Sequence, residues 1–279
     1  MIVFPNAKIN LGLHVTEKRP DGFHNIETIF SPVSDKPGEG GRFCDVLEVL
    51  PSSGKQDAIQ VTGNTEDIPD QDNLVMKALQ MMREKYPVPP VNIHLHKKIP
   101  SGAGLGGGSS NAAFMLKSVN DLFKLNISNG DLETMASHLG ADCAFFIRNN
   151  PTLAKGKGNE FSPVSLDLKG YWLAIVVPPY PIGTAEAYRN IHPRIPERDI
   201  LEIIQQTPEK WQTLLVNDFE PYAISLKCPE VKLIKETLYE KGAAYTSMSG
   251  SGSAVYGIFR QQPEMAWPDS HIYWCGPIE

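Results

Sequence analysis

Cysteine is scarce in this chain of 279 residues, and the few cysteines lie far apart. The four are Cys44, Cys143, Cys228 and Cys275, and no Cys-x-x-Cys pair occurs among them. Zinc modules and disulfide scaffolds depend on closely spaced cysteines, so the sequence excludes both classes. A reducing compartment is the expected environment, because a framework of disulfides is absent.

Long apolar runs and a basic charge balance are missing as well. The longest apolar run covers residues 172–177, whereas a membrane-spanning helix needs about 20 apolar residues. Polar or helix-breaking residues interrupt the N-terminal stretch at Pro5, Asn6, Lys8 and Asn10, which is not typical of a secretory signal. The net charge of −6 argues against a general nucleic-acid binder. We expect a cytoplasmic protein that binds neither membrane nor nucleic acid.

Glycine and proline, in contrast, are present at ordinary levels, with 23 residues each. Apolar residues make up 41% of the chain and charged residues 21%, as in globular proteins. This composition excludes collagen-like and disordered chains. The length predicts roughly two domains.

Hydrophobic periodicity predicts a mixture of strands and helices. The predicted strands cover residues 7–15, 26–30, 45–50, 58–61, 91–95, 173–177 and 254–259. The predicted helices cover residues 73–85, 109–123, 131–139, 198–206, 208–216 and 229–241. Residues 34–41 are predicted to form a loop. The mixed order indicates an α+β fold with two lobes.

The most informative local feature is the glycine-rich segment KIPSGAGLGGGSSNA at residues 98–112, between a predicted strand and a predicted helix. Four of its glycines can adopt a positive φ or let a ligand approach the backbone. These four are Gly102, Gly104, Gly106 and Gly107. Ser109, Ser110 and Asn111 are expected to open the helix with free N–H groups. Such a helix start favours phosphate.

Other phosphate-binding loops fit this segment less well. A Walker A motif ends in Gly-Lys-Ser/Thr, but here the last glycine is followed by Ser109. Gly102, Gly104 and Gly107 satisfy the dinucleotide pattern Gly-x-Gly-x-x-Gly. That fold also needs an acidic residue about twenty positions later, and Asp121 lies too early and inside a predicted helix. An NAD-dependent dehydrogenase remains an alternative on this pattern.

The segment PSGAGLGGGSSNAA at residues 100–113 resembles the ATP loop of the GHMP kinases, which include galactokinase, homoserine kinase and mevalonate kinase. Three further segments are similar to motifs of that family. They are PNAKINLGLHVTEKRPDGFHNIETIF at 5–30, LGADCAFF at 139–146 and MSGSGSAVYGIF at 248–259. The resemblance implies a two-lobed α+β fold. Residues 1–153 would form the N-terminal domain with the ATP loop, residues 154–279 the C-terminal domain, and the active cleft would lie between them.

The three consecutive glycines at 106–108 and the segment at 5–30 resemble one branch of the family. Its members use ATP and Mg²⁺ to phosphorylate the 2-hydroxyl of 4-diphosphocytidyl-2-C-methyl-D-erythritol, in the non-mevalonate route to isoprenoid precursors. A homoserine- or mevalonate-type kinase stays an alternative, because the ATP loop is shared. An RNA-binding module is a third, since the N-terminal lobe of the family resembles a ribosomal-protein fold.

The resemblance also implies roles for particular residues. Asp142 would be the general base and Lys8 the cation beside it, although by its sequence context alone Lys8 would be interpreted as a solvated strand lysine. The residues implied in substrate binding are Asn10, Phe23, His24, Thr184 and Tyr188. Asn10 shares a strand face with Lys8. Phe23 and His24 suit a cytosine ring, by stacking and hydrogen bonding.

The residues implied in ATP binding gather around the glycine loop. They are Asn73, Lys97, Pro100, Gly102, Gly104, Leu105, Gly106, Gly107, Gly108, Ser109, Ser110 and Asn111. Mg²⁺ would arrive with ATP, with Ser109 or Ser110 as the candidate to help hold it. No resident metal site is expected, because His94 and His96 have no third ligand nearby. The expected partners are small molecules, and the chain would be a monomer or a homodimer.

Overall fold

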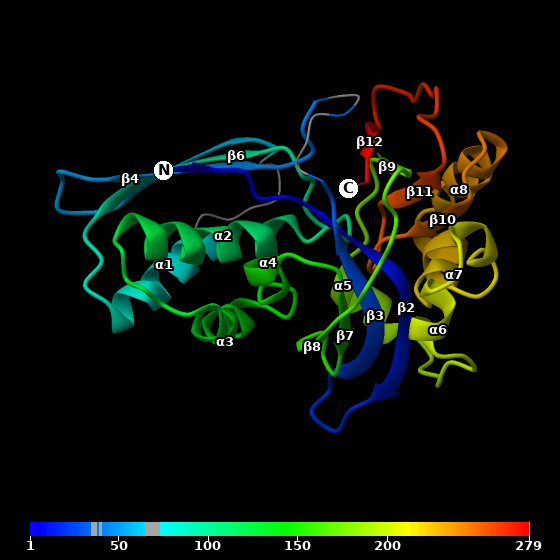
Figure 1. Cartoon of the computed structure of the whole chain (residues 1–279), viewed down its shortest axis with the longest axis horizontal. Coiled ribbons are helices and arrows are strands. Elements are labelled where there is room, and N and C mark those ends of the chain that lie inside the picture. The colour runs from blue at the N-terminus through cyan, green and yellow to red at the C-terminus, as the bar shows by residue number, and fades with distance from the viewer. Residues whose placement is uncertain (35–37, 39–40, 65–72, 279) are drawn as a thin grey trace. The chain divides into compact units, whose positions relative to one another are not determined.

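The computed structural model describes residues 1–34, 38, 41–64 and 73–278, and the chain divides into two compact units (Figure 1). The first unit contains Met1–Ala7, Cys44–Ser101 and Gly106–Asn150. The second contains Lys8–Phe43, Gly102–Leu105 and Pro151–Glu279. The chain passes between the units for the last time at residues 150–151, near the predicted domain boundary after residue 153. That boundary stays a prediction.

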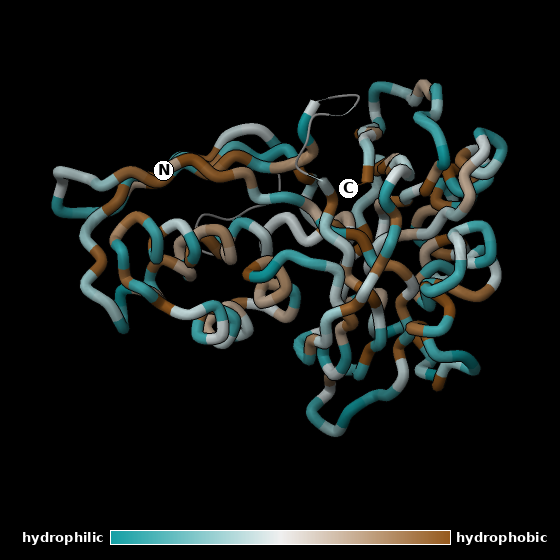
Figure 2. The backbone as a smooth tube through the Cα atoms, viewed as in Figure 1, coloured by the Kyte–Doolittle hydropathy of each residue, from teal (hydrophilic) through white to brown (hydrophobic). Residues whose placement is uncertain are grey.

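The first unit is a four-stranded sheet with helices packed on one face (Figure 1). Its strand order is β1 (Ile2–Val3), β4 (Val46–Pro51), β6 (Val91–Lys97) and β5 (Ala58–Gly63), with β5 parallel to β6. Its helices are α1 (Leu74–Lys85), α2 (Gly107–Leu122), α3 (Asn129–Leu139) and α4 (Phe145–Arg148). Val91, Ile93 and Leu95 alternate with polar residues along β6 and are buried. Figure 2 shows the hydrophobic residues along these strands.

The second unit holds two four-stranded sheets. One has the order β2 (Lys8–Lys18), β3 (His24–Pro32), β7 (Thr152–Lys155) and β8 (Glu160–Pro163). The other has the order β10 (Tyr245–Met248), β11 (Val255–Phe259), β9 (Trp172–Val177) and β12 (Ile272–Pro277). The helical segments are α5 (Thr184–Arg189), α6 (Ile200–Ile204), η2 (Pro208–Lys210), α7 (Glu220–Tyr222), η3 (Ala223–Lys227) and α8 (Glu230–Glu240).

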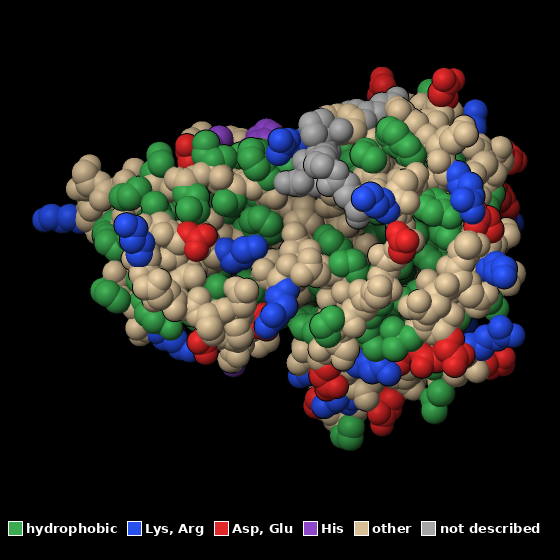
Figure 3. All heavy atoms as spheres, viewed as in Figure 1, with side chains coloured by type: hydrophobic (Ala, Val, Ile, Leu, Met, Phe, Trp, Pro, Cys, Tyr) green, Lys and Arg blue, Asp and Glu red, His purple; other side chains and the backbone are tan. Residues whose placement is uncertain are grey.

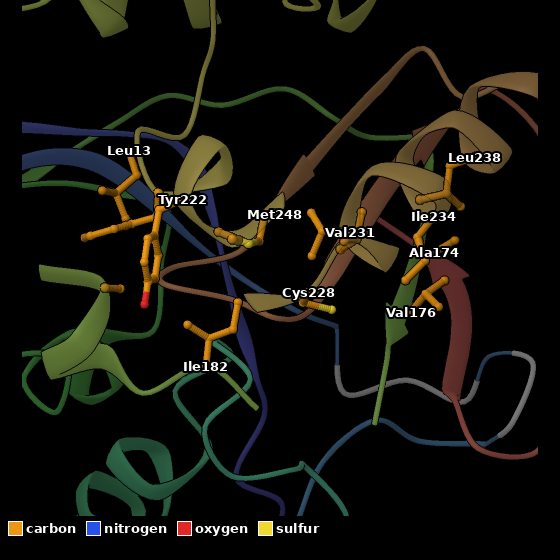
Figure 4. Close-up of a cluster of buried hydrophobic side chains, with 14 of the residues drawn as sticks. Leu13, Ala174, Val176, Ile182, Tyr222, Cys228, Val231, Ile234, Leu238 and Met248 are labelled. Atoms are coloured by element: carbon orange, nitrogen blue, oxygen red, sulfur yellow. The ribbon is translucent and has the colours of Figure 1, made fainter. Parts of the chain in front are cut away.

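A hydrophobic core joins the two sheets of this second unit (Figure 4). Leu13 on β2 and Met248 on β10 belong to the same buried cluster as Val231 and Ile234 on α8. The backbone continues this connection, because Leu13 N donates to the carbonyl of Val216 at 2.9 Å. Strand β2 is therefore fixed on both sides along its central part.

Most of the predicted elements are confirmed, and one helix is wrong. Residues 208–216 form only the 3₁₀ turn η2 followed by further turns, not a helix. The apolar spacing that suggested a helix instead buries Trp211 and Leu215 in turns, after which the chain extends to pair with β2. Strands β10 and β12 and the hairpin of β7 and β8 were not predicted. Most of the predicted loop at 34–41 lies outside the described residues.

No helix in the described part of the chain is long and apolar enough to cross a membrane. All four cysteines are buried, and none of them forms a disulfide. Acidic and basic side chains are interspersed over the face drawn in Figure 3.

Candidate active site

The glycine loop takes the backbone conformation that its sequence requires. Gly102, Gly104 and Gly106 have positive φ angles of 68°, 78° and 71°, which residues with a Cβ rarely adopt. Gly107 differs, because it is helical and its glycine is needed for close packing. A Cβ at that position would lie 2.9 Å from the Ile99 side chain. Three of the four glycines singled out in the sequence therefore have a positive φ.

The glycine turn at residues 249–252 supports the part of the loop that belongs to the second unit. Ser249 Oγ donates to the carbonyl of Gly104 at 2.9 Å, and Ala254 N donates to the carbonyl of Ala103 at 3.1 Å. A Cβ on Gly104 would lie only 2.0 Å from the carbonyl oxygen of Ser249. The two glycine motifs of the sequence are thus packed backbone against backbone.

Helix α2 begins at Gly107 with Gly106 as its N-cap, two residues before the predicted start. Ser110 N already donates to the Gly106 carbonyl at 2.9 Å, so the expectation of free N–H groups at Ser110 and Asn111 is wrong. The first three helical residues, Gly107, Gly108 and Ser109, carry the amides without an intrahelical acceptor. The left-handed conformation of Gly106 causes the shift, because it turns the chain into the helix earlier.

Ser109 and Ser110, the two candidates for holding Mg²⁺, differ in their surroundings. Ser110 is fully buried, and its hydroxyl has no hydrogen-bond partner among the described residues. Ser109 is half-buried and hydrogen-bonds to Cys143. Burial raises the pKa of the Cys143 thiol to about 11, so this cysteine is protonated at neutral pH and is no thiolate nucleophile.

Lys97 is buried at the end of β6, although a lysine at a strand end is more often solvated. Its ammonium group pairs with Asp45 and donates to Asn111 Oδ1 at 2.8 Å. The amide of Asn111 donates in turn to Asp45 Oδ2 at 2.8 Å. The side chain of Asn111 is thus bound within the protein, and Asp45 joins the cluster although no local pattern in the sequence indicates it.

Asn73 and Pro100, two further residues assigned to ATP, both belong to the first unit. Asn73 is the N-cap of α1, and its Oδ1 accepts the N–H of Val75 at 2.9 Å. Capping α1 is a structural role for Asn73. A contact of Asn73 with adenine stays a prediction. Pro100 is half-buried between β6 and the glycine loop.

Lys8 and Asn10 lie on one face of β2 and contact each other, as the period of a strand predicts. Lys8 Nζ donates to Asn10 Oδ1 at 2.6 Å and lies 4.9 Å from the ring centroid of Phe30. Asn10 Nδ2 donates to Thr28 Oγ1 at 3.0 Å. Lys8 is only 3% exposed, so its interpretation as a solvated strand lysine is wrong. The backbone of Lys8 donates to the Leu105 carbonyl at 2.9 Å, which ties β2 to the glycine loop.

Asp142 lies in the turn between α3 and α4 and is half-buried. The preceding Gly140 approaches both Cys143 and Ser109, since a Cβ there would lie 3.2 Å from the sulfur and 4.0 Å from Ser109 Oγ. The turn that carries Asp142 therefore packs beside the first turn of α2. Lys8 belongs to the other unit, so the pairing of Asp142 with Lys8 stays a prediction.

All five residues assigned to the substrate belong to the second unit, and three of them are aromatic or imidazole rings. The His24 and Tyr188 rings are stacked with centroids 5.1 Å apart, and Tyr188 meets Phe219 edge-on at 4.9 Å. Phe23 precedes His24 and is 59% exposed, with Lys157 Nζ 4.8 Å from its ring centroid. A stacked pair of rings and an exposed Phe23 ring thus lie at the start of β3. Lys157, at the tip of the β7–β8 hairpin, was missed because only the fold brings it to Phe23.

Thr184 and His24 supply polar groups beside these rings. Thr184 Oγ1 lies 3.0 Å from Ser251 Oγ, so it contacts the turn that supports the glycine loop. Burial, together with nearby Lys18, lowers the pKa of His24. The ring is thus neutral at pH 7 and carries one donor and one acceptor nitrogen. Such a pair matches the edge of a pyrimidine base.

His94 and His96, which are not expected to hold a metal, both contact Thr62. Its Oγ1 lies 2.9 Å from His94 Nε2 and 3.0 Å from His96 Nδ1. Within the described ranges, no group of three or more His, Cys, Asp or Glu side chains is arranged to hold a metal ion.

Comparison with known proteins agrees with this geometry. The family model for the GHMP kinases N-terminal domain matches residues 73–150, and the one for the GHMP kinases C-terminal domain matches residues 193–266. The 4-diphosphocytidyl-2-C-methyl-D-erythritol kinase of Bacteroides thetaiotaomicron is 50% identical over 96% of both chains. That of Parabacteroides distasonis is 50% identical over 94% of this chain and 92% of its own.

Solved structures give the same result. A crystal structure of 4-(cytidine 5'-diphospho)-2C-methyl-D-erythritol kinase has a TM-score of 0.76 and 31% identity, covering 92% of this chain and 90% of its own. A mevalonate kinase from Methanococcus jannaschii has a TM-score of 0.67 at 12% identity, which shows the shared fold. These matches favour a kinase over the dehydrogenase and RNA-binding alternatives. The chain belongs to the GHMP kinases, and among them to the 4-diphosphocytidyl-2-C-methyl-D-erythritol kinase family.

Proposed function

We propose that this chain transfers the γ-phosphoryl group of ATP to the 2-hydroxyl of 4-diphosphocytidyl-2-C-methyl-D-erythritol. The observation that carries the substrate is the stack of the neutral His24 ring on Tyr188, with the exposed ring of Phe23 next to His24 in the sequence. A cytosine base needs both features, whereas homoserine and mevalonate have no ring to stack. The names of the relatives at 46–50% identity support the same acceptor.

The phosphate end of ATP is assigned to the loop of Gly102–Gly108 and the first turn of α2. The free amides of Gly107, Gly108 and Ser109 and the positive end of the helix dipole stabilise an anion there. Most of the catalysis of phosphoryl transfer comes from alignment and charge stabilisation, because the transition state is loose and anionic. The rigid packing of Gly104 on Ser249 serves that alignment.

Lys8 and Asp142 are assigned to the acceptor hydroxyl. Lys8 is held by Asn10, whose amide is fixed by Thr28, so its ammonium group has a defined direction. Asp142 would accept or orient the proton of the hydroxyl, a step that typically contributes about 10²–10⁴-fold. Asn10 acts in this assignment through Lys8 as well as on the substrate.

Mg²⁺, when bound with ATP, would neutralise part of the phosphate charge. Ser109 is the better placed of the two serines to help hold it, because the Ser110 hydroxyl is fully enclosed. The proposal places the enzyme in the cytoplasm, in keeping with four buried cysteines that form no disulfide. A monomeric or homodimeric state is part of the same proposal.

The test is a coupled assay of ADP release with three acceptors at equal concentration: the cytidyl methylerythritol substrate, homoserine and mevalonate. We expect turnover with the first alone, and ³¹P NMR should locate the new phosphate on the 2-hydroxyl. Turnover with homoserine or mevalonate, and none with the cytidyl compound, would show that the acceptor is assigned wrongly.

A further inference from the structure

Asp45 is a fully buried carboxylate that stands just before β4 and has no role in the mechanism above. Its Oδ1 accepts the backbone N–H groups of Lys98 at 2.7 Å and Ile99 at 2.8 Å. Its Oδ2 accepts the Asn111 amide at 2.8 Å and pairs with the ammonium group of Lys97. Four donors thus converge on one side chain, from the last residue of β6, the two residues after it and α2, and a buried carboxylate requires such an arrangement.

The ammonium group that Asp45 holds lies directly under the first turn of α2. A Cβ on Gly107 would be 3.3 Å from Lys97 Nζ, so the charge is close to the first helical residue. Asn111, one turn further along the helix, accepts a second proton of the same group at 2.8 Å. The positive charge and the free amides of the helix start are therefore neighbours within the first unit.

We propose that Asp45 is a positioning residue, which keeps Lys97 charged and directed at the first turn of α2 so that lysine and helix act together on the phosphates of ATP. The inference rests on the proposed assignment of the ATP phosphates to this turn. Asp45 does not touch the nucleotide; it acts through Lys97 and Asn111.

Burial is the reason why Lys97 needs such a partner. Desolvation lowers the pKa of Lys97, and the carboxylate of Asp45 acts in the opposite direction. Among the residues that the structure describes, Asp45 is the one charged group that acts on this lysine, and its other hydrogen-bond partner, Asn111, is a neutral amide. Without the carboxylate, the buried lysine would lose its proton at a lower pH.

The experiment measures the Kd of ATP–Mg²⁺ by calorimetry from about pH 7 to about pH 9, a window below the ordinary pKa of lysine. For the native protein we expect a nearly constant Kd. For Asp45→Asn we expect binding about 10- to 100-fold weaker, in the range of a lost charge-assisted contact, and weakening further as pH rises. Lys97→Met should bind weakly at every pH.

Asp57→Asn is the matched control. Asp57 also accepts a backbone N–H, from Val91, and pairs with Arg83 in the same unit, but away from α2. Its loss should lower the melting temperature and leave the pH dependence of ATP binding unchanged. A purely structural role of Asp45 would give this same pattern and would overturn the inference.

The double variant D45N/N111D moves the carboxylate across the cluster and keeps the total charge. Lys97 then again has an acidic partner at the position of Asn111, so we expect much of the ATP affinity and its flat pH profile to return. If Asp45→Asn does not fold, this variant alone decides: binding as weak as that of Lys97→Met contradicts the proposal. A native protein without ATP affinity would instead refute the proposed function itself.

Discussion

At the scale of single residues, a substitution of Asp142 distinguishes an effect on turnover from an effect on ATP binding. Asp142→Asn should lower kcat by about 10²–10⁴-fold, because an amide cannot take the proton of the acceptor hydroxyl. The Kd of ATP should change little, since the amides of α2 remain in place. Steady-state kinetics and calorimetry measure the two quantities. Asp131→Asn, in the Ser128 cap of α3, is the control and should alter neither. An equal loss of ATP affinity would assign Asp142 to binding or folding.

Phe23 tests the aromatic group in the same way. Phe23→Ala removes a stacking face that is mostly exposed, so stability should hardly change. A lost base–aromatic contact amounts to about 1–3 kcal/mol, which predicts an increase of roughly 5- to 150-fold in the KM of the cytidyl substrate. Phe23→Tyr keeps the face and should behave like the native enzyme. If the KM of ATP rises instead, Phe23 belongs to the ATP site and its assignment to the substrate is wrong.

The sequence predicts some of these residues on physical grounds and others only by resemblance. The two-residue period of β2 correctly places Lys8 and Asn10 on one face, because strand geometry is local. The stack of His24 on Tyr188 joins residues that are far apart in the chain, and no local pattern contains it. Asp45 is the clearest omission, since its partners Lys97 and Asn111 come from later elements.

At the scale of elements, the glycine loop is predicted to depend on Gly104 more than on its neighbours. Gly104→Ala would need a positive φ and would place a Cβ 2.0 Å from the Ser249 carbonyl. Strain and overpacking together should lower the free energy of unfolding by roughly 2–4 kcal/mol. Gly108→Ala meets only Leu74 at 3.8 Å, so its stability should stay equal or rise by up to about 1 kcal/mol. Urea unfolding compares the two, and equal losses would contradict the argument.

Element boundaries show where a local reading of the sequence fails. The start of α2 was predicted at the serines, since N-cap preference favours them, but the left-handed Gly106 starts the helix earlier. Residues 208–216 have helical spacing but form turns, because the end of this segment hydrogen-bonds to β2. Strand β12 follows a segment without a clear pattern, and its pairing with β9 decides its conformation.

At the scale of the whole molecule, the net charge of −6 opposes a polyanionic ligand. Any attraction for ATP must therefore be local, from buried cations such as Lys97 and from the start of α2. Figure 3 agrees with this view, because charges of both signs are mixed over the face shown. Binding of ATP should accordingly depend on Mg²⁺, which offsets part of the phosphate charge before the nucleotide meets an acidic protein.

Thermal unfolding with nucleotides tests this expectation. A ligand present at about 100 times its Kd stabilises the native state by about 2.7 kcal/mol, or roughly 5–10 °C in Tm for a chain of this size. ATP–Mg²⁺ should give such a shift, and ATP with a chelator a smaller one, because the unscreened phosphates repel the acidic surface. NAD at the same concentration should give none. A shift with NAD and not with ATP–Mg²⁺ would instead show that the glycine loop binds a dinucleotide, as its Gly-x-Gly-x-x-Gly pattern also allows.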